Sequence, residues 1–206
     1  MLIDVTSEND WVSIYHLCIS FINPRPIALV STVSPDGKPN LAPFSFYNMV
    51  SARPPVVIFC PGLTRDGAEK DSLVNAKATG EFVIATVTSD IAARMASCAA
   101  NLPYGESEFA FSGLTPTAAS RVTPALVSEA KVNIECKLRE IVTTGSEAGS
   151  SSVVFGDVLV IHVADEVLDE QRRQVDPNKL RTVGRLGGQW YCDVTDPYEI
   201  KIPKRE

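Results

Sequence analysis

The segment 63–72, LTRDGAEKDS, concentrates the residues best suited to hold an anion. Arg65 and Lys70 precede a predicted helix, and Ser72 lies in its first turn. The unpaired amides and the positive dipole end of a helix N-terminus favour a bound anion. Arginine adds a bidentate fork, lysine a point charge and serine a hydroxyl, with charge-assisted bonds of about 1.5–3 kcal/mol each. The alternative is a solvent-exposed helix start whose cations balance the neighbouring acids, because such charge mixtures are common on surfaces.

A second group of candidate residues follows in the segment 42–48, APFSFYN. It places Ser45 and Asn48 among aromatic residues, two of which are Phe46 and Tyr47. A flat heteroaromatic ligand needs aromatic walls with hydroxyl and amide groups at its edge. The alternative is a core strand in which Ser45 and Asn48 satisfy backbone groups at a turn.

Two further features are weaker candidates. His162 is expected on the same strand face as Val158 and Val160. A lone histidine on an apolar strand is more often a hydrogen-bonded core residue than an acid or a ligand, and it can also donate to a bound substrate. The segment 185–191, RLGGQWY, combines a cation, a flexible backbone and two aromatics, which suits either a lid over a pocket or a turn whose Trp190 packs on the body.

Several common catalytic motifs are missing from the chain. No G-x-G-x-x-G follows a strand, and neither the G-x-x-x-x-G-K-[ST] loop nor the G-x-S-x-G elbow occurs. The five cysteines are scattered and there are only two histidines, so no metal site is predicted. Reduced thiols in a cytoplasm are the expected state of these cysteines.

Length and composition indicate one globular domain spanning residues 1–206 that needs no disulfide or metal to hold its core. Acidic residues outnumber basic ones by 25 to 19, and no basic stripe appears, which argues against nucleic acid as a partner. The longest apolar runs are too short to cross a bilayer. The first residues lack the basic region of a secretory signal. We therefore expect a cytoplasmic protein without a membrane partner.

The elements that must position these residues are mostly strands. Pro35 and Gly37 form a turn between two strands, and Pro43 favours an edge position for the second of them. Strict alternation over 131–139 predicts a half-buried strand whose polar face is wet. A later strand contains Gly156, where a bulge or a close backbone approach is expected. The predicted strands cover residues 26–33, 41–48, 55–60, 81–87, 131–139 and 153–163.

Helices fill only a few connections. Asp71 is expected to cap a helix over 72–79 that ends at Gly80. A second helix, capped by Ser89 or Asp90, carries apolar residues at helical spacing up to Leu102, and a third surrounds Trp11, Ile14, Tyr15 and Cys18. The stretch 102–124 is a long loop of the kind that often serves function. Regular βαβ alternation is missing, so we predict a mainly β, antiparallel barrel with a few helices.

The order of several motifs resembles the flavin reductase-like, FMN-binding split-barrel family over most of the chain, from about Pro24 to Tyr191. The motifs that carry this resemblance are PRPIALVST at 24–32, NLAPFSFYN at 40–48, KDS at 70–72 with Asn75, GEFV at 80–83 and VGRLGG at 183–188.

The resemblance implies a six-stranded Greek-key split barrel over about 24–165, with a C-terminal extension over 166–206. It also implies a homodimer that binds FMN near the subunit interface. Asp71, close to a dianionic phosphate, is assigned to helix capping or to ribityl hydroxyls. The remaining implied contacts are Val30, Ser31 and Thr32 beside the isoalloxazine, Ser45, Phe46, Tyr47 and Asn48 at its edge and ribityl chain, and Arg65, Lys70 and Ser72 at the phosphate.

The activity implied by the resemblance is that of an NAD(P)H:flavin reductase, with hydride passing from nicotinamide C4 of NADH or NADPH to flavin N5. Reduced flavin would then serve a flavin-dependent monooxygenase. The chain departs from many small reductases of the group, since Gly156-Asp157-Val158 replaces Gly-Asp-His and the nearby imidazole is that of His162. The alternatives are an FMN-holding electron carrier, a reductase of another small substrate, and a non-catalytic dimeric barrel that binds a small ligand.

Overall fold

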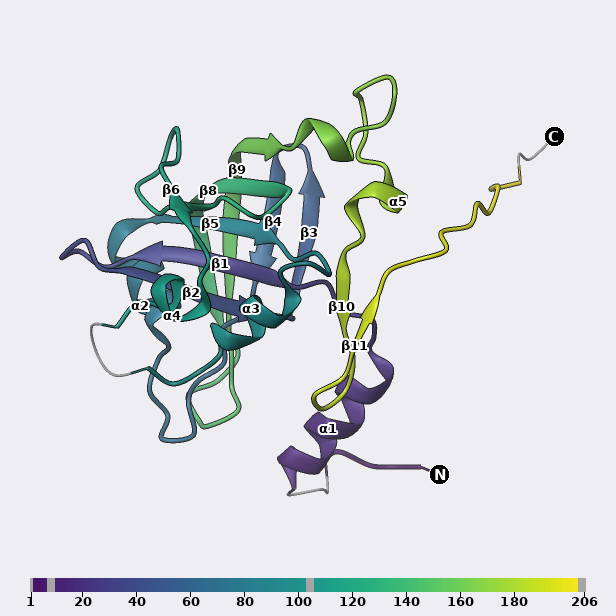
Figure 1. Ribbon diagram of the computed structural model, residues 1–206. Coiled ribbons are helices and arrows are strands. Elements are labelled where there is room, and N and C mark those ends of the chain that lie inside the picture. The colour runs from purple at the N-terminus through teal and green to yellow at the C-terminus, as the bar shows by residue number, and fades with distance from the viewer. Residues whose placement is uncertain (1, 7–9, 103–105, 204–206) are drawn as a thin grey trace.

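A seven-stranded antiparallel sheet dominates the computed structural model, which describes residues 2–6, 10–102 and 106–203 (Figure 1). The spatial order of its strands is β2-β1-β5-β8-β9-β4-β3. The strands are β1 (Ala28–Val33), β2 (Pro39–Phe44), β3 (Tyr47–Ala52), β4 (Pro55–Phe59), β5 (Glu81–Thr86), β8 (Val132–Thr143) and β9 (Ser152–Val163).

The sheet curls into an open barrel because its two edge strands are neighbours in sequence. β2 ends at Phe44 and β3 begins at Tyr47, so only Ser45 and Phe46 connect opposite ends of the strand order. β2 pairs with β1, and β3 pairs with β4, which leaves the barrel split between them. The predicted mainly β split-barrel fold is confirmed. It has seven strands where six were expected, because the predicted strand 41–48 breaks at Ser45 and Phe46.

The barrel interior is packed around three aromatic rings. Phe59 lies between Phe44 and Phe82, with ring centroids 5.2 and 5.1 Å away. Gly156 makes the close backbone approach that its position in the strand predicts: a Cβ built there would lie 2.3 Å from Cζ of Phe82. The barrel therefore closes tightly over Phe82, which is fully buried.

Helices and short strands cover the barrel. α2 lies against β1, and α4 lies against β2. α1 and the β10–β11 hairpin stand together beside the barrel (Figure 1). The helices are α1 (Trp11–Phe21), α2 (Asp71–Thr79), α3 (Ala92–Ser97), α4 (Glu108–Ser112), the 3-10 helix η1 (Asp165–Val167) and α5 (Pro177–Leu180), and the short strands are β6 (Pro116–Thr117), β7 (Leu126–Val127), β10 (Val183–Arg185) and β11 (Tyr191–Asp193).

Two predicted helix caps are wrong. Lys70 occupies the N-cap position of α2 without a side-chain cap bond, and Asp71 is the first helical residue. α3 begins after Ile91, since the Ser89 hydroxyl donates instead to Asp193 at 2.7 Å and Asp90 accepts from Thr88 at 2.5 Å.

The lengths of two predicted segments also change. α3 ends at Ser97, which leaves Leu102 outside it. The predicted loop 102–124 contains α4 and β6, while its residues 103–105 lie outside the described part of the chain. Among the described residues, no helix has the length and apolar character needed to cross a membrane.

The predicted wet face of β8 is partly buried. Glu135 is fully buried and Asn133 is 6% exposed. The chain returns over this face after α4, and its backbone amides at Arg121 and Val122 donate to the Glu135 carboxylate at 2.6 and 3.1 Å. The alternation predicted that these polar residues would be exposed to solvent. They are buried because the segment after α4 covers them.

Candidate functional site

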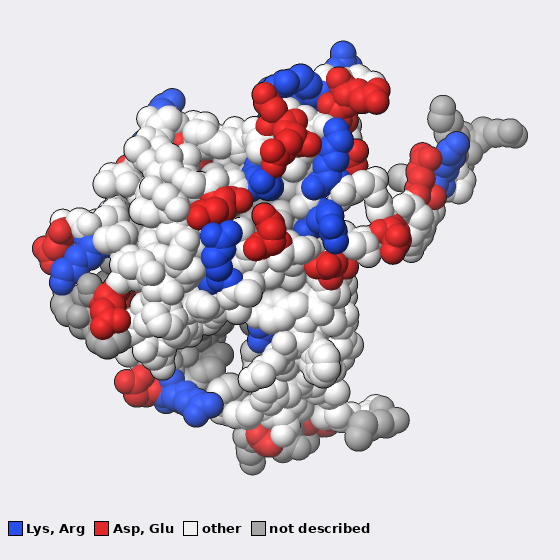
Figure 2. Space-filling model, in the orientation of Figure 1, with Lys and Arg blue, Asp and Glu red and all other residues white. Residues whose placement is uncertain are grey.

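A cavity of about 480 Å³ opens where β2 turns into β3, and Figure 2 shows the surface hollowed between α1 and the loops below the barrel. Its volume is within the range of about 300–1,000 Å³ typical of small-molecule sites. The lining residues come from α1, the segment 25–27 before β1, the β2–β3 turn with the end of β2, the two loops 60–70 and 148–151, α3 with the residues after it, and the β10–β11 hairpin. Segments distant in sequence therefore meet at one site.

α1 forms the outer wall of the cavity and is fixed at both ends. At its C-terminal end, the Arg25 guanidinium donates to the carbonyl oxygens of Ile19 and Ile22 at 2.9 and 2.7 Å. At its N-terminal end, the Trp11 ring lies against Gly149, where an added Cβ would be 2.7 Å from the ring. Gly149 has a φ of +91°, so this position favours glycine both for its backbone and for its space.

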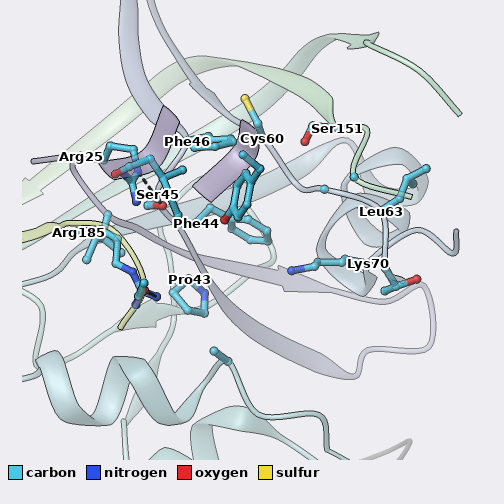
Figure 3. A pocket seen from close by; sticks show the side chains of 18 of the residues that line it. Arg25, Pro43, Phe44, Ser45, Phe46, Cys60, Leu63, Lys70, Ser151 and Arg185 are labelled. Carbon is cyan, nitrogen blue, oxygen red and sulfur yellow. Dashed lines mark hydrogen bonds between the residues drawn. The ribbon is translucent and has the colours of Figure 1, made fainter. Parts of the chain in front are cut away.

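The β2–β3 turn supplies the aromatic surface of the cavity. Phe44 and Phe46 both line it, and Ser45 lies between them (Figure 3). The amide of Cys60 donates to the Phe46 carbonyl at 2.9 Å, which fixes the turn against the end of β4. Nε of Arg25 lies 3.4 Å from the Ser45 hydroxyl oxygen. The turn thus presents a hydroxyl and two rings to a ligand.

Arg65 and Lys70 line the same cavity as this turn. The Lys70 ammonium lies 5.6 Å from the centroid of the Phe44 ring, and desolvation by the surrounding protein lowers the pKa of Lys70. The acids close to them are engaged elsewhere: Asp66 accepts from the Thr64 hydroxyl, and Glu69 pairs with Lys77. Asp66 and Glu69 therefore do not balance Arg65 and Lys70, as the alternative of a solvent-exposed helix start had predicted.

The cavity has a strong excess of positive charge. Arg25 and Arg185 line it as well, so four cationic side chains line the cavity from three separate segments. None of the described lining residues is an aspartate or a glutamate. A cavity with aromatic walls and uncompensated cations is chemically suited to a planar anionic ligand. The residues present thus fit a phosphorylated, flat cofactor.

Several residues that the resemblance assigned to the site lie in the interior instead. Val30 is fully buried in the barrel core, and Ser31 is fully buried with a hydroxyl oxygen that has no hydrogen-bond partner among the described residues. The Thr32 hydroxyl accepts from Asn40 at 3.0 Å, and the same Asn40 amide donates to the Ser72 hydroxyl at 3.0 Å. The bonds among Thr32, Asn40 and Ser72 join α2 to β1 and β2, and neither Val30, Ser31, Thr32 nor Ser72 lines the cavity.

Other predicted site residues point away from the cavity. Tyr47 lines a second cavity of about 170 Å³, and burial raises the pKa of Tyr47 to about 12. Asn48 is exposed, and its side chain accepts from the amide of Met49 at 2.8 Å. Asp71 is exposed in the first turn of α2. Ser45, Phe46, Arg65 and Lys70 are the predicted residues that do converge on the main cavity.

His162 lies away from the cavity and serves a different contact. Its Nε2 is 2.6 Å from Oε1 of the buried Glu135, and its side chain is 35% exposed. The expected hydrogen bond is present, but the residue is partly open to solvent rather than in the core. The predicted lid is partly present: Arg185, Gly188 and Tyr191 line the cavity, whereas Trp190 is 75% exposed and does not pack on the body.

Arg25, Trp11 and Tyr15 also line the cavity, although no site role was assigned to them from the sequence. From the sequence, Arg25 was named only as part of the motif PRPIALVST. Its position between Pro24 and Pro26 restricts its backbone to a narrow range, and this restriction was a signal that could have singled it out. Trp11 and Tyr15 are spaced by four, so they share one face of α1 and both reach the cavity. That spacing predicted the helix but not the surface it would cover.

The fold and the cavity define a split-barrel protein with a cleft lined by aromatic and cationic side chains. The chain belongs to the flavin reductase-like family, because the family model described as "Flavin reductase like domain" matches residues 21–179. This confirms the resemblance found in the sequence. Membership places the chain among flavoprotein oxidoreductases.

Solved structures and relatives agree with this assignment. Nitrilotriacetate monooxygenase component B from Bacillus cereus is 30% identical with a TM-score of 0.89, covering 97% of this chain and 98% of that one. The 2-nitrobenzoate 2-nitroreductase of Pseudomonas fluorescens is 28% identical with a TM-score of 0.87, covering 98% and 96%. An uncharacterised protein of Aquifex aeolicus is 37% identical over 198 residues, which is 96% of this chain and 98% of its own.

Proposed function

We propose that this protein is an FMN-dependent oxidoreductase that acts as an NAD(P)H:flavin reductase. The observation that carries the proposal is the convergence of Lys70 and Arg65 with the Phe44–Phe46 turn in one cavity, whose described lining residues include no acid. The cation pair suits a terminal phosphate, and the aromatic turn suits a ring system. FMN combines these two chemical groups in one molecule.

Each residue has a defined task in this proposal. Lys70 and Arg65 bind the phosphate through charge-assisted bonds, which are about twice as strong as neutral ones. The amides at the start of α2, a nine-residue helix, add donors and the positive end of its dipole. Phe44 and Phe46 orient the ring, and α1 excludes water from one side of the cavity. When bound, FMN would supply the redox chemistry, which is the acceptance of a hydride from NADH or NADPH.

The remaining partners are part of the same proposal. A flavin-dependent monooxygenase is proposed as the acceptor of reduced flavin, because component B of a monooxygenase is 30% identical to this chain. A homodimer is supported by α1, which carries no Lys, Arg, Asp or Glu and leaves Phe21 64% exposed (Figure 2). The five free cysteines match a cytoplasmic location.

The test compares FMN with riboflavin, which lacks the phosphate, in the double variant Arg65→Ala, Lys70→Ala. Losing two charge-assisted contacts of about 1.5–3 kcal/mol each is expected to weaken FMN binding by about 3–6 kcal/mol, while riboflavin binding changes little. Flavin fluorescence titration measures both affinities. Lys137→Ala removes an exposed cation from β8 and is the control. Equal losses for the two flavins would contradict the phosphate assignment.

Turnover with NADH and NADPH, each with free FMN or FAD, tests the reaction. Bleaching of the flavin absorbance after mixing with a reduced nicotinamide is the expected result. A protein that binds FMN and shows no bleaching with either nicotinamide would be an electron carrier or a reductase with another donor. A protein whose melting temperature does not rise with FMN would be a plain barrel, since a ligand of the native state must stabilise it.

A further inference from the structure

Two arginines face each other at the end of the cavity opposite Lys70. The Arg25 amide donates to the Arg185 carbonyl at 2.9 Å, and the Arg185 amide donates to the Arg25 carbonyl at 2.8 Å. A residue pair that exchanges both bonds in this way places its side chains on the same face. Both guanidinium groups line the cavity, and Figure 3 shows them together, with Phe44 between them and Lys70.

This arrangement is unfavourable without an anion. Like charges directly opposite each other on paired strands are destabilising, and Arg25 is only 7% exposed. Burial lowers the pKa of Arg25, and the charge of Arg185 lowers it further, against an opposing contribution from Tyr15. A buried charge is normally paired with an opposite charge. Here the described surroundings of the pair supply none.

The acceptors that the pair already uses are all neutral. The Arg25 guanidinium donates to the Leu186 carbonyl at 2.9 Å, in addition to two carbonyls of the α1 end and the Ser45 hydroxyl. Arg185 donates to the Tyr191 hydroxyl and to the Gly188 carbonyl. An arginine has five N–H donors, and these two bonds leave Arg185 with free donors toward a ligand. Arg25 is thus fixed in place while Arg185 retains binding capacity.

Flat surfaces flank the pair. The Arg185 guanidinium lies 4.4 Å from the centroid of the Tyr191 ring, and the Arg25 guanidinium lies 5.9 Å from that of Phe46. A planar guanidinium held over a ring keeps its fork in a fixed orientation, which suits the planar oxygens of a carboxylate or the oxygens of a phosphate. The site is therefore shaped for an oxyanion carried on a planar molecule.

We propose that Arg25 and Arg185 form a second anion subsite, which binds the carboxylate or phosphate of the molecule that exchanges electrons with the flavin. The inference rests on the proposed function, in which the FMN phosphate lies at Lys70 and Arg65. A single phosphate at that end leaves the charge of the Arg25–Arg185 pair uncompensated. The electron donor or acceptor of this protein is accordingly an organic anion.

The test titrates three probes into the FMN-loaded protein by calorimetry: benzoate, its neutral analogue benzamide, and ADP-ribose, which carries a pyrophosphate. The wild type is expected to bind benzoate or ADP-ribose at least about tenfold more tightly than benzamide. Arg185→Gln is expected to weaken the anion by about tenfold, equivalent to about 1.4 kcal/mol, and to leave benzamide unchanged. Arg173→Gln, which removes an exposed arginine, is the charge-matched control.

The probes separate the two sources of the oxyanion. A loss confined to benzoate assigns the subsite to a carboxylate substrate, and a loss confined to ADP-ribose assigns it to the dinucleotide. Arg185→Lys keeps the charge but not the fork, so it is expected to weaken the anion by about threefold, and it replaces Arg185→Gln if that variant does not fold. Equal binding of all probes by the wild type and both variants would overturn the proposal.

FMN binding is measured on the same proteins. Its affinity is expected to stay within about threefold in Arg185→Gln. A loss of FMN affinity as large as in the double variant Arg65→Ala, Lys70→Ala would place Arg185 at the flavin phosphate and overturn the second subsite. If the wild type binds no FMN, the proposed function fails, while anion titration of the flavin-free protein still reports on the arginine pair.

Discussion

Lys70 and Phe44 lie against each other, with the lysine ammonium 5.6 Å from the centroid of the phenylalanine ring. Lys70 is the N-cap residue of α2 and Phe44 is the last residue of β2, so two segments that are separate in sequence share one cavity wall. A cation over an aromatic face contributes about 0.5–2 kcal/mol depending on its desolvation. The contact holds the ammonium at the cavity without using a carboxylate, which keeps its charge available to an anion.

Ser72 is expected to matter for stability and not for the flavin phosphate. Its hydroxyl is 1% exposed and accepts from Asn40 at 3.0 Å, while the same amide serves Thr32. Ser72→Ala removes a buried hydrogen bond and should lower the unfolding free energy by about 1 kcal/mol. Urea denaturation measures this change. FMN affinity is expected to stay within about twofold of the wild-type value. A tenfold loss of FMN affinity with unchanged riboflavin affinity would show that Ser72 does contact the phosphate.

The Glu135 carboxylate is expected to make stability depend on acid pH. Burial alone would raise the pKa of Glu135, but the Ser120 hydroxyl, His162 and the amides of Ser120 and Arg121 donate to the carboxylate and lower its pKa to about 2. A depressed native pKa stabilises the protein above the unfolded value of about 4.3. This contribution should be present at neutral pH and be lost as pH falls from about 5 to about 2.

Glu135→Gln isolates this contribution. The difference in unfolding free energy between the wild type and this variant should be largest near pH 7, at about 2 kcal/mol or more, and should shrink in acid. Urea denaturation at several pH values measures it. Glu140→Gln changes an exposed carboxylate on the same strand and provides the control. A difference that is constant between pH 7 and pH 3 would exclude the assigned linkage.

Gly156 is expected to reject even one methyl group. A Cβ at this position would lie 2.3 Å from Cζ of Phe82 and 3.2 Å from Cβ of Cys136. Overpacking a closed core typically costs about 1–3 kcal/mol, so Gly156→Ala should lower the melting temperature. Phe82→Leu supplies space for the methyl group, and the double variant should therefore lose less than the sum of the two single losses. Additive losses would show that Phe82 is not the obstacle.

The strands, the turn and part of the site could be predicted from local patterns. Apolar runs predicted β1, β4 and β5, and Pro35 with Gly37 predicted the hairpin turn, because these signals extend over only a few residues. The position of Arg65 and Lys70 before a helix likewise predicted that the two cations would lie together, and both line the cavity. Their chemistry follows from residue type and spacing alone.

Other features depended on segments far away in the chain. The run 41–48 is continuous in sequence, and its break at Ser45 and Phe46 arises because the barrel needs β2 and β3 at opposite edges. The alternation over 131–139 places Glu135 on the polar face, where exposure was expected. It is buried because the segment around Ser120 packs over it and supplies the hydrogen-bond donors for its carboxylate.

The sequence by itself thus determined which residues can bind an anion and which segments extend. Only the tertiary structure decided which of these residues line the cavity. It buries Ser72 in the interior, and it places Arg25 beside Arg185. The physical reason is that residue type sets hydrogen-bonding capacity locally. Whether a polar group is buried, and whether a charge has a partner, depends on which distant segment packs beside that group.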